Sequence, residues 1–415
     1  MAKILITSLG TGTKKEGTYR KANYEIEKTV YSDETFIAKA LTKHYGIEKI
    51  FMVGTSGSMW DEVYSVYGGE NSDKTLELYE KKETDSITYD DLAEVSSAMD
   101  SYLNSEDSKC FLVSYGLNDN ELWSNFEQYL KMSEYINDGD EIYLDITHSF
   151  RSLAIMSFLM TQFIEQVRQK DIRLGGIFYG MWEYSGQNNN ITPVVNMSIL
   201  AEIQEWTKAV GYLKYFGNAT MLYELISNNC AFHTDKDTKN VFMHLSNNIS
   251  MGNITGIYEA VQTVKRRISI LETSSNPVAA YLSKDIKEFV SSLDYEKETD
   301  FSLALAKWFM ANRNYGMSYL VLYDFVIAKI CELNGLNPDN KEEQEQAKNI
   351  IYKLAHSPDR RLSVFYETVE NIRKIRNSIA HSTGRSGASV SDINNLPEYL
   401  RKIEAAFKVL KGNIS

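Results

Sequence analysis

The hydrophobic and polar positions of the first 180 or so residues alternate between two patterns. Five short apolar runs predict buried strands, at residues 3–10, 49–54, 109–116, 141–146 and 172–180. Helical patterns lie between them, notably at 32–46, 90–103 and 150–167, the first with Ser32 or Asp33 as N-cap and Gly46 as its stop. Because strands rich in Val, Ile and Leu that alternate with helices are typical of a covered parallel sheet, we predict a Rossmann-like, doubly wound domain.

The pattern changes at about residue 198. Strand signals fade there, and helical periodicity dominates as far as the C-terminus. We therefore expect an α/β half with a mostly parallel sheet, followed by an all-α half. The expected division is an N-terminal domain at 1–185, a connecting helical region at 186–300 and a C-terminal helical domain at 301–415.

Composition excludes several classes of protein. The 415 residues are 43% hydrophobic and 24% charged, which suits two or three packed domains and not a disordered chain. A net charge of −12 argues against a general nucleic-acid-coating surface, although one local basic site remains compatible with it. The three cysteines are far apart and form no CxxC pair, so neither a disulfide framework nor a zinc site is indicated. No apolar run reaches about 20 residues, so we expect a cytoplasmic protein without a membrane segment. We also expect no bound metal.

Small, hydroxylated and amide residues gather where the predicted strands end, and ligands of open α/β sheets bind beyond those ends. The candidate ligand-binding residues are Ser8, Gly10, Thr11, Gly12, Thr13, Thr55, Ser56, Gly57, Trp60, Tyr115, Asp145, Thr147, His148, Ser149 and Arg151. Taken singly, a glycine loop could be only a turn, Asp145 could cap the next helix, and His148 could be a structural imidazole. Four such ends on one edge favour a nucleotide-type pocket, in which glycines admit phosphate and Trp60 or Tyr115 stacks on a base.

A second motif, Arg376-Asn377-x₃-His381, ends the amphipathic helical stretch at 364–382. Taken alone, His381 could be a residue stabilised by the helix C-terminus, and Arg376 could be a surface charge. On an ideal helix these two side chains lie about 140° apart, so one helix makes a poor two-residue site. Two copies facing each other would pool two arginines and two histidines, which fits a C₂ dimer.

Together the two motifs resemble the CARF–HEPN ribonucleases of type III CRISPR systems. The resemblance is carried by Gly10-Thr11-Gly12 and Asp145-Ile146-Thr147-His148 in a Rossmann-like domain, and by Arg376-Asn377-x₃-His381 in a helical one. The Asp-x-Thr-His element is characteristic of a CRISPR-associated subfamily in which glycine usually follows the histidine, whereas Ser149 follows it here. The resemblance implies a CARF ligand-sensing domain at 1–185 and a HEPN domain at 301–415.

The resemblance also implies a ligand-switched enzyme. Cyclic oligoadenylate, with the tetra-adenylate favoured over the hexa-adenylate, would bind across the two-fold axis of a homodimer or a higher oligomer. The HEPN dimer would then cut single-stranded RNA without metal or cofactor, using Arg376, Asn377 and His381, and the CARF domain could also cleave its own activator. One alternative is a CARF transcription regulator without nuclease activity, against which the acidic chain counts. The other is a Rossmann dehydrogenase, against which Lys15 counts, because it stands where GxGxxG has its third glycine.

Overall fold

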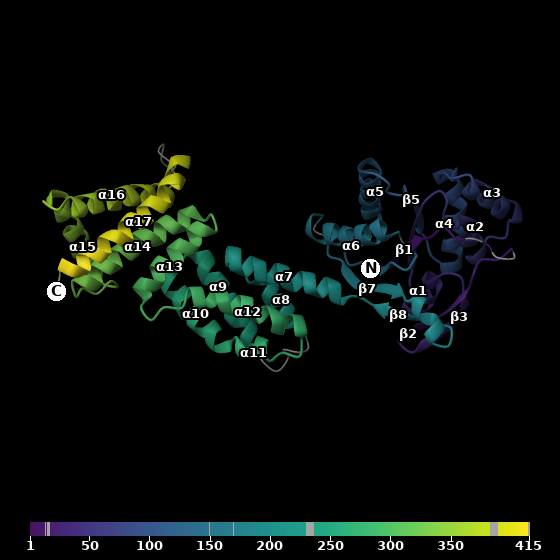
Figure 1. The fold of residues 1–415 in the computed structure, drawn as a ribbon, viewed down its shortest axis with the longest axis horizontal. Coiled ribbons are helices and arrows are strands. Elements are labelled where there is room, and N and C mark those ends of the chain that lie inside the picture. Colours follow the sequence, from purple (N-terminus) through teal and green to yellow (C-terminus); the bar gives the residue numbers. More distant parts are fainter. Residues whose placement is uncertain are drawn as a thin grey trace. The chain divides into compact units, whose positions relative to one another are not determined.

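The structure is a computed structural model that describes residues 1–415 except 13, 15–16, 149, 169, 230–235, 382–388 and 414–415. It forms two compact units, Met1–Leu200 and Ala201–Ser415 (Figure 1). Each unit has its own cluster of buried hydrophobic side chains.

The first unit is built on one eight-stranded sheet of order β3-β2-β8-β7-β6-β1-β4-β5. Strands β7, β6, β1, β4 and β5 run parallel, β8 is antiparallel to β7, and the β2–β3 pair extends the sheet beyond β8. The strands are β1 Lys3–Leu9, β2 Ala22–Ile26, β3 Thr29–Glu34, β4 Lys49–Gly54, β5 Lys109–Leu112, β6 Glu141–Asp145, β7 Arg173–Gly180 and β8 Ile191–Asn196. The mostly parallel sheet that the sequence predicts is thus confirmed.

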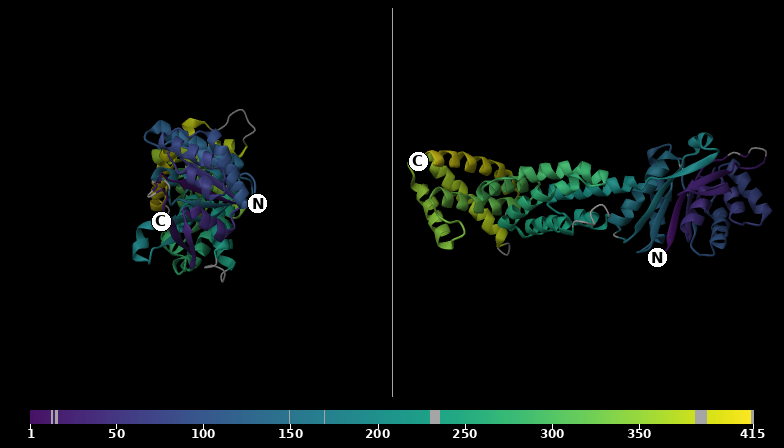
Figure 2. Two further views of the ribbon diagram at one scale, coloured as in Figure 1. Left: turned by 90° about the vertical axis from the view of Figure 1, so that its right-hand side faces the viewer. Right: turned by 90° about the horizontal axis from the view of Figure 1, so that it is seen from below.

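Helices cover both faces of this sheet (Figures 1 and 2). The helices are α1 Ile37–Tyr45, α2 Trp60–Val66, α3 Ser72–Glu83, α4 Tyr89–Leu103, α5 Asp119–Met132, η1 Ser133–Tyr135, α6 Arg151–Gln166 and η2 Trp182–Gln187. The expected start of the first helix is wrong, because β3 extends to Glu34 and Phe36 is the N-cap of α1. Its expected stop is confirmed, since Gly46 has a φ of 67°, a left-handed conformation that glycine adopts without strain.

The expected boundary at residue 185 is also wrong in one respect. Residues 191–196 form β8, which pairs with β7 and β2 inside the sheet, so they are not part of a connecting helical region. Pro193 followed by two valines is only a weak strand signal in the sequence. The strand forms because these residues pair with β7. The further division at residue 300 stays a prediction.

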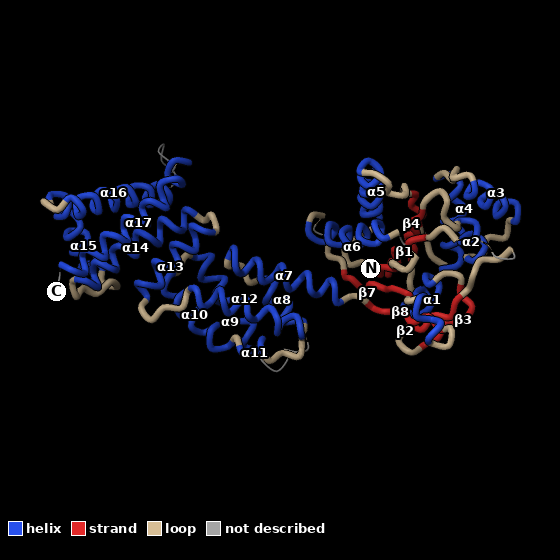
Figure 3. Tube along the Cα trace, in the orientation of Figure 1, coloured by secondary structure: helices blue, strands red, loops and turns tan. Residues whose placement is uncertain are grey.

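The second unit is helical throughout its described residues (Figure 3). Its helices are α7 Ile199–Phe216, α8 Thr220–Asn228, α9 Lys236–Met251, α10 Ile254–Arg267, α11 Ser269–Glu272, α12 Pro277–Ser292, α13 Glu298–Ala311, α14 Tyr315–Leu333, α15 Lys341–Lys353, η4 Leu354–His356, α16 Arg360–Ala380 and α17 Val390–Asn413. Helix α14 is the most apolar and packs against α13, α15, α16 and α17. The predicted fold class, α/β followed by all-α, is confirmed.

None of the helices in the described part of the chain combines the length and the apolar character that crossing a bilayer requires.

Candidate functional site

The ends of β1, β4 and β6 meet at one edge of the sheet. In the parallel register Thr7 lies opposite Asp145, and Leu9 lies opposite Gly54. The loops that follow these strands carry most of the candidate ligand-binding residues. Thr13 and Ser149 lie outside the described residues, so the structure says nothing about them.

Asp145 is buried at the centre of this edge, and both of its carboxylate oxygens accept a hydrogen bond from a neighbour. The Thr7 hydroxyl donates to its Oδ2 at 2.6 Å, and the Thr147 backbone N–H donates to its Oδ1 at 2.9 Å. The Thr147 hydroxyl in turn accepts the Gly180 N–H at 2.9 Å. These bonds link β1, β6 and β7, so Asp145 and Thr147 hold the strand ends together. Asp145 does not cap α6, whose N-cap is Phe150.

His148 lies beside Asp145 but makes no such bonds. Its Nε2 is buried and has no hydrogen-bond partner in the described structure. Burial lowers the pKa of the imidazole, and the nearby Asp145 carboxylate opposes this shift. A Cβ on Gly10 would stand 3.2 Å from the His148 carbonyl oxygen, so a glycine lets the two loops approach closely. A neutral imidazole with an open nitrogen is thus held next to the glycine loop.

The loop after β4 is tied down from within. Trp60 is completely buried and its Nε1 donates to the Thr55 carbonyl at 2.8 Å, so the expectation that Trp60 stacks on a base is wrong. The Ser58 hydroxyl donates to the Leu9 carbonyl at 2.9 Å, which joins this loop to β1. A Cβ on Gly12 would come within 1.9 Å of the Met59 sulfur, so any larger residue there would have to displace the Met59 side chain.

Tyr115 and Ser56 meet at a residue that the sequence motifs did not indicate. Their hydroxyls donate to the same Asp85 oxygen, at 2.8 and 2.7 Å respectively. Gly57 lies against this pair, since a Cβ there would stand 2.5 Å from the Tyr115 hydroxyl. Asp85 sits in an exposed loop with a φ of 54°, and no strand-end pattern marks it. Tyr115 therefore stays at the rim, whereas Trp60 belongs to the core.

The cations of this region are mostly engaged within the protein. Lys14 forms an ion pair with buried Asp61 at 2.9 Å, and the Arg20 guanidinium lies 3.7 Å from the centre of the Trp182 ring. Lys82, which the sequence reasoning missed, donates to the Gly12 carbonyl at 2.9 Å from the distant helix α3. Of the remaining candidates, Ser8 is buried, whereas Thr11 and Arg151 are exposed.

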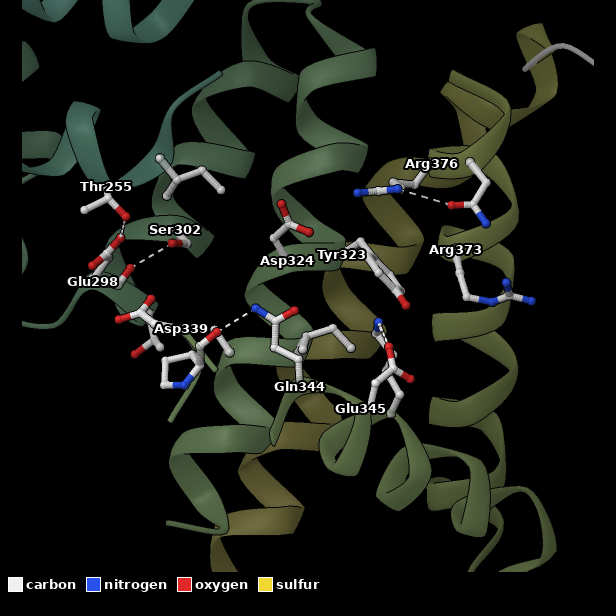
Figure 4. A pocket seen from close by; sticks show the side chains of 17 residues that line it. Thr255, Glu298, Ser302, Tyr323, Asp324, Asp339, Gln344, Glu345, Arg373 and Arg376 are labelled. Atoms are coloured by element: carbon white, nitrogen blue, oxygen red, sulfur yellow. Dashed lines mark hydrogen bonds and ion pairs between the residues drawn. The ribbon is translucent and has the colours of Figure 1, made fainter. Parts of the chain in front are cut away.

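In the second unit, Arg376 and Asn377 line a cavity of about 630 Å³ between α13, α14, α15 and α16 (Figure 4). The Arg376 Nη1 donates to the Asn377 Oδ1 at 3.3 Å, and its guanidinium lies 5.8 Å from the centre of the Tyr323 ring. Its Nε is buried and has no partner in the described structure. The guanidinium is thus positioned by contacts that leave donor capacity unused.

His381 is placed differently. It is exposed at the end of α16, where its backbone N–H donates to the Asn377 carbonyl at 2.9 Å, and it does not line the cavity. One chain therefore brings Arg376 and Asn377 together at the cavity. His381 does not line it, and on an ideal helix its side chain lies about 140° from Arg376 but on the same face as Asn377. Within the described residues, no group of three or more His, Cys, Asp or Glu is arranged to hold a metal ion.

Comparisons with known proteins match both units. Residues 4–183 match the family model described as the CARF domain of the CRISPR system endoribonuclease Csx1. Residues 202–297 match the second domain of CRISPR-associated protein MJ1674. The full-length MJ1674 from Methanocaldococcus jannaschii is 29% identical over 451 aligned residues, which cover 100% of this chain and 69% of that protein.

A solved structure also aligns with the chain. It is Enterococcus italicus Csm6 bound to cyclic hexa-2'-fluoro-hexa-dAMP, with a TM-score of 0.42 and 11% identity over 100% of this chain and 96% of the other. The sequence matches confirm the resemblance to CRISPR-associated CARF proteins, while assignment to the Asp-x-Thr-His subfamily stays a prediction. Residues 4–183 are thus similar to the CARF domain of Csx1, and the chain as a whole is similar to a CRISPR-associated protein.

Proposed function

We propose that this protein is a cyclic-oligoadenylate-activated endoribonuclease of type III CRISPR antiviral defence that cuts single-stranded RNA without a metal ion. The second unit would act as a HEPN nuclease in a homodimer or higher oligomer. The observation that carries the proposal is the Arg376 guanidinium, which lines a cavity next to Asn377 and has a buried nitrogen without a partner. Such a group is suited to an incoming phosphate.

The chemistry needs few groups, because RNA carries its own nucleophile in the 2′-hydroxyl. The exposed imidazole of His381 is free to exchange protons with the reacting oxygens, which typically contributes about 10²–10⁴-fold to the rate. Arg376 would stabilise the charge that develops on the phosphate, and Asn377 would keep the guanidinium oriented. Two α16 helix ends facing each other across a two-fold axis would place His381 of one chain near Arg376 of the other.

The first unit would sense the activator, with cyclic tetra-adenylate as the first choice of ring. Its strand-end loops offer Gly10 and Gly12, the buried imidazole of His148 and rim hydroxyls for a nucleotide. Binding would activate the nuclease only by favouring one arrangement of the dimer over another. A hundredfold activation requires a difference in binding free energy of about 2.7 kcal/mol.

The test is cleavage of labelled single-stranded RNA in EDTA, with and without cyclic tetra-adenylate. We expect cleavage that resists EDTA and that the activator stimulates. Absence of cleavage at any activator concentration, with the cyclic hexa-adenylate tried in parallel, would contradict the proposal and favour a CARF regulator without nuclease activity. Chromatography of the activator after long incubation with His381→Ala protein also shows whether the CARF domain opens its own ligand.

A further inference from the structure

The cavity beside Arg376 has two walls of opposite character. Its volume of about 630 Å³ falls within the roughly 300–1,000 Å³ of typical ligand sites. Lys348, Arg373 and Arg376 contribute positive charge from α15 and α16. The facing side carries the hydroxyl and carboxylate groups of Thr255, Glu298, Ser302 and Asp339. Tyr323 and Asp324 of α14 and Gln344 of α15 lie between the two sides (Figure 4). A ligand with an anionic end and a hydrogen-bonding end would match both walls.

Two of the three cations are already paired with carboxylates. Arg373 holds Glu370 through two bonds, Nε to Oε1 and Nη2 to Oε2, both at 2.9 Å, and Lys348 pairs with Glu345 at 2.6 Å. Arg376 has no ion-pair partner among the residues that the structure describes, and its Nε is buried without a hydrogen bond. Arg376 is half-buried, and because its guanidinium has no carboxylate partner in the described structure, it is the cation best placed to take an external anion.

Asp324 faces the same cavity. Its exposed surface lines the cavity, and its carboxyl has no hydrogen bond or ion pair within the described structure. Loss of hydration raises the pKa of this carboxyl, and the charges of Arg376 and Lys348 partly counteract that rise. The adjacent Tyr323 ring lies below the Arg376 guanidinium. The cavity thus presents an uncommitted acceptor as well as an uncommitted cation.

We propose that this cavity binds one nucleotide of the RNA strand, with Arg376 on its phosphate and Asp324 on the edge of its base, and that Asp324 selects against uracil. A carboxylate can only accept hydrogen bonds. Adenine, cytosine and guanine each present an exocyclic amine to such an acceptor, whereas uracil presents one N–H between two carbonyl oxygens that repel it. The inference rests on the proposed function and adds the base preference of the same site.

The test measures binding, so it does not depend on cleavage. The full chain with His381→Ala is titrated in EDTA against two labelled RNA octamers, one of adenosine and one of uridine. We expect tighter binding of the adenosine octamer. Adding Asp324→Asn should reduce that preference about tenfold, because an amide donates to uracil oxygens as well as accepting from amines.

Two further variants separate the phosphate from the base. Arg376→Gln should weaken both octamers to a similar extent and flatten the salt dependence, because a phosphate contact carries no sequence information. Glu367→Gln removes one exposed carboxylate from α16 outside the cavity and should leave both affinities unchanged.

The outcomes distinguish this inference from the proposed function. The nucleotide site is overturned if Asp324→Asn leaves the ratio of the affinities for the adenosine and uridine octamers unchanged, or if neither octamer binds. Either result counts against the site even where the unmodified protein cleaves RNA. A ratio that changes as expected supports the site, and it does so even in a protein that fails to cleave RNA. If the protein binds the octamers as expected but does not cleave RNA, only its assignment as a nuclease is rejected.

Discussion

The two motif clusters use their polar side chains in opposite ways. At the strand ends of the first unit, Asp145 is buried, and both of its carboxylate oxygens accept bonds inside the protein, from Thr7 and Thr147. In the helical unit, the Arg376 guanidinium reaches a cavity with donors unused. The first motif therefore builds a framework, whereas the second offers its side chains to a ligand.

This difference separates stability from activity. Where motif residues hold loops in place, a ligand meets backbone N–H groups, His148 and rim residues, and losing a motif residue costs folding free energy. Where motif residues have hydrogen-bonding groups that the protein itself leaves unused, replacing them should lower the reaction rate and change the stability of the fold only a little. A short polar motif can thus either hold the fold together or bind a ligand. Burial with satisfied hydrogen bonds indicates the first role.

The largest expected effect tests the helical side of this comparison. Arg376→Ala or His381→Ala should abolish RNA cleavage, a loss on the order of 10²–10⁴-fold for the histidine alone. His381 is exposed and Arg376 makes no ion pair in the described structure. The free energy of opening that amide hydrogen exchange reports for α14 and α16 should therefore change by less than about 1 kcal/mol. Full cleavage by His381→Ala in EDTA would refute the assignment.

The second-largest expected effect tests Asp145 in the first unit. Asp145→Ala would leave the Thr7 hydroxyl and the Thr147 N–H without their acceptor, at a cost of about 1–3 kcal/mol for each group. We expect hydrogen exchange to show lower protection in β1 and β6, with α14 and α16 unaffected. Asp145→Asn, which keeps an acceptor oxygen, serves as the matched control and should cost less. Unchanged protection of β1 in the alanine variant would mean that Asp145 is not a framework residue.

The smallest effect concerns acid. Because burial lowers the pKa of His148 in the folded state, the unfolded chain binds a proton more readily below its ordinary pKa of about 6.5. The contribution of His148 to stability is therefore present at neutral pH and lost as the pH falls below about 6.5. Between pH 6.5 and 5.5 the first unit of the wild-type protein should lose up to about 1 kcal/mol more of its free energy of protection in β6 than His148→Gln does. Equal losses in the two proteins would contradict a buried, neutral imidazole.

Much of the fold follows from periodicity. The five parallel strands are long enough, and rich enough in Val, Ile and Leu, to be predicted from the sequence. Strands β2, β3 and β8 were missed because they lie toward one edge of the sheet, where tertiary pairing outweighs local pattern. Exposed polar positions in Thr29–Glu34 even resemble a helix start, which displaced the expected N-cap of α1.

The sites were predictable only in part. Strand-end position correctly brought Gly10, Gly12, Asp145 and Thr147 to one edge of the sheet. It could not show that Trp60 points into the core, nor that Asp85 and Lys82 reach the loops from α3 and the turn after it, because these contacts depend on packing between distant segments. The cavity partner Asp324 was missed for the same reason, since α14 reads as an almost uniformly apolar helix.

The most direct test joins the two units in one experiment, the rate of RNA cleavage against activator concentration in EDTA. We predict that replacing Thr147 and His148 together by alanine raises the cyclic tetra-adenylate concentration needed for half-maximal cleavage. The reason is that His148 keeps an unpaired nitrogen beside the glycine loop, and the Thr147 hydroxyl holds the strand ends around that site. Basal cleavage without activator should remain at the wild-type rate. A midpoint that does not move, or basal cleavage lost together with activation, would contradict a sensor in the first unit that controls a nuclease in the second.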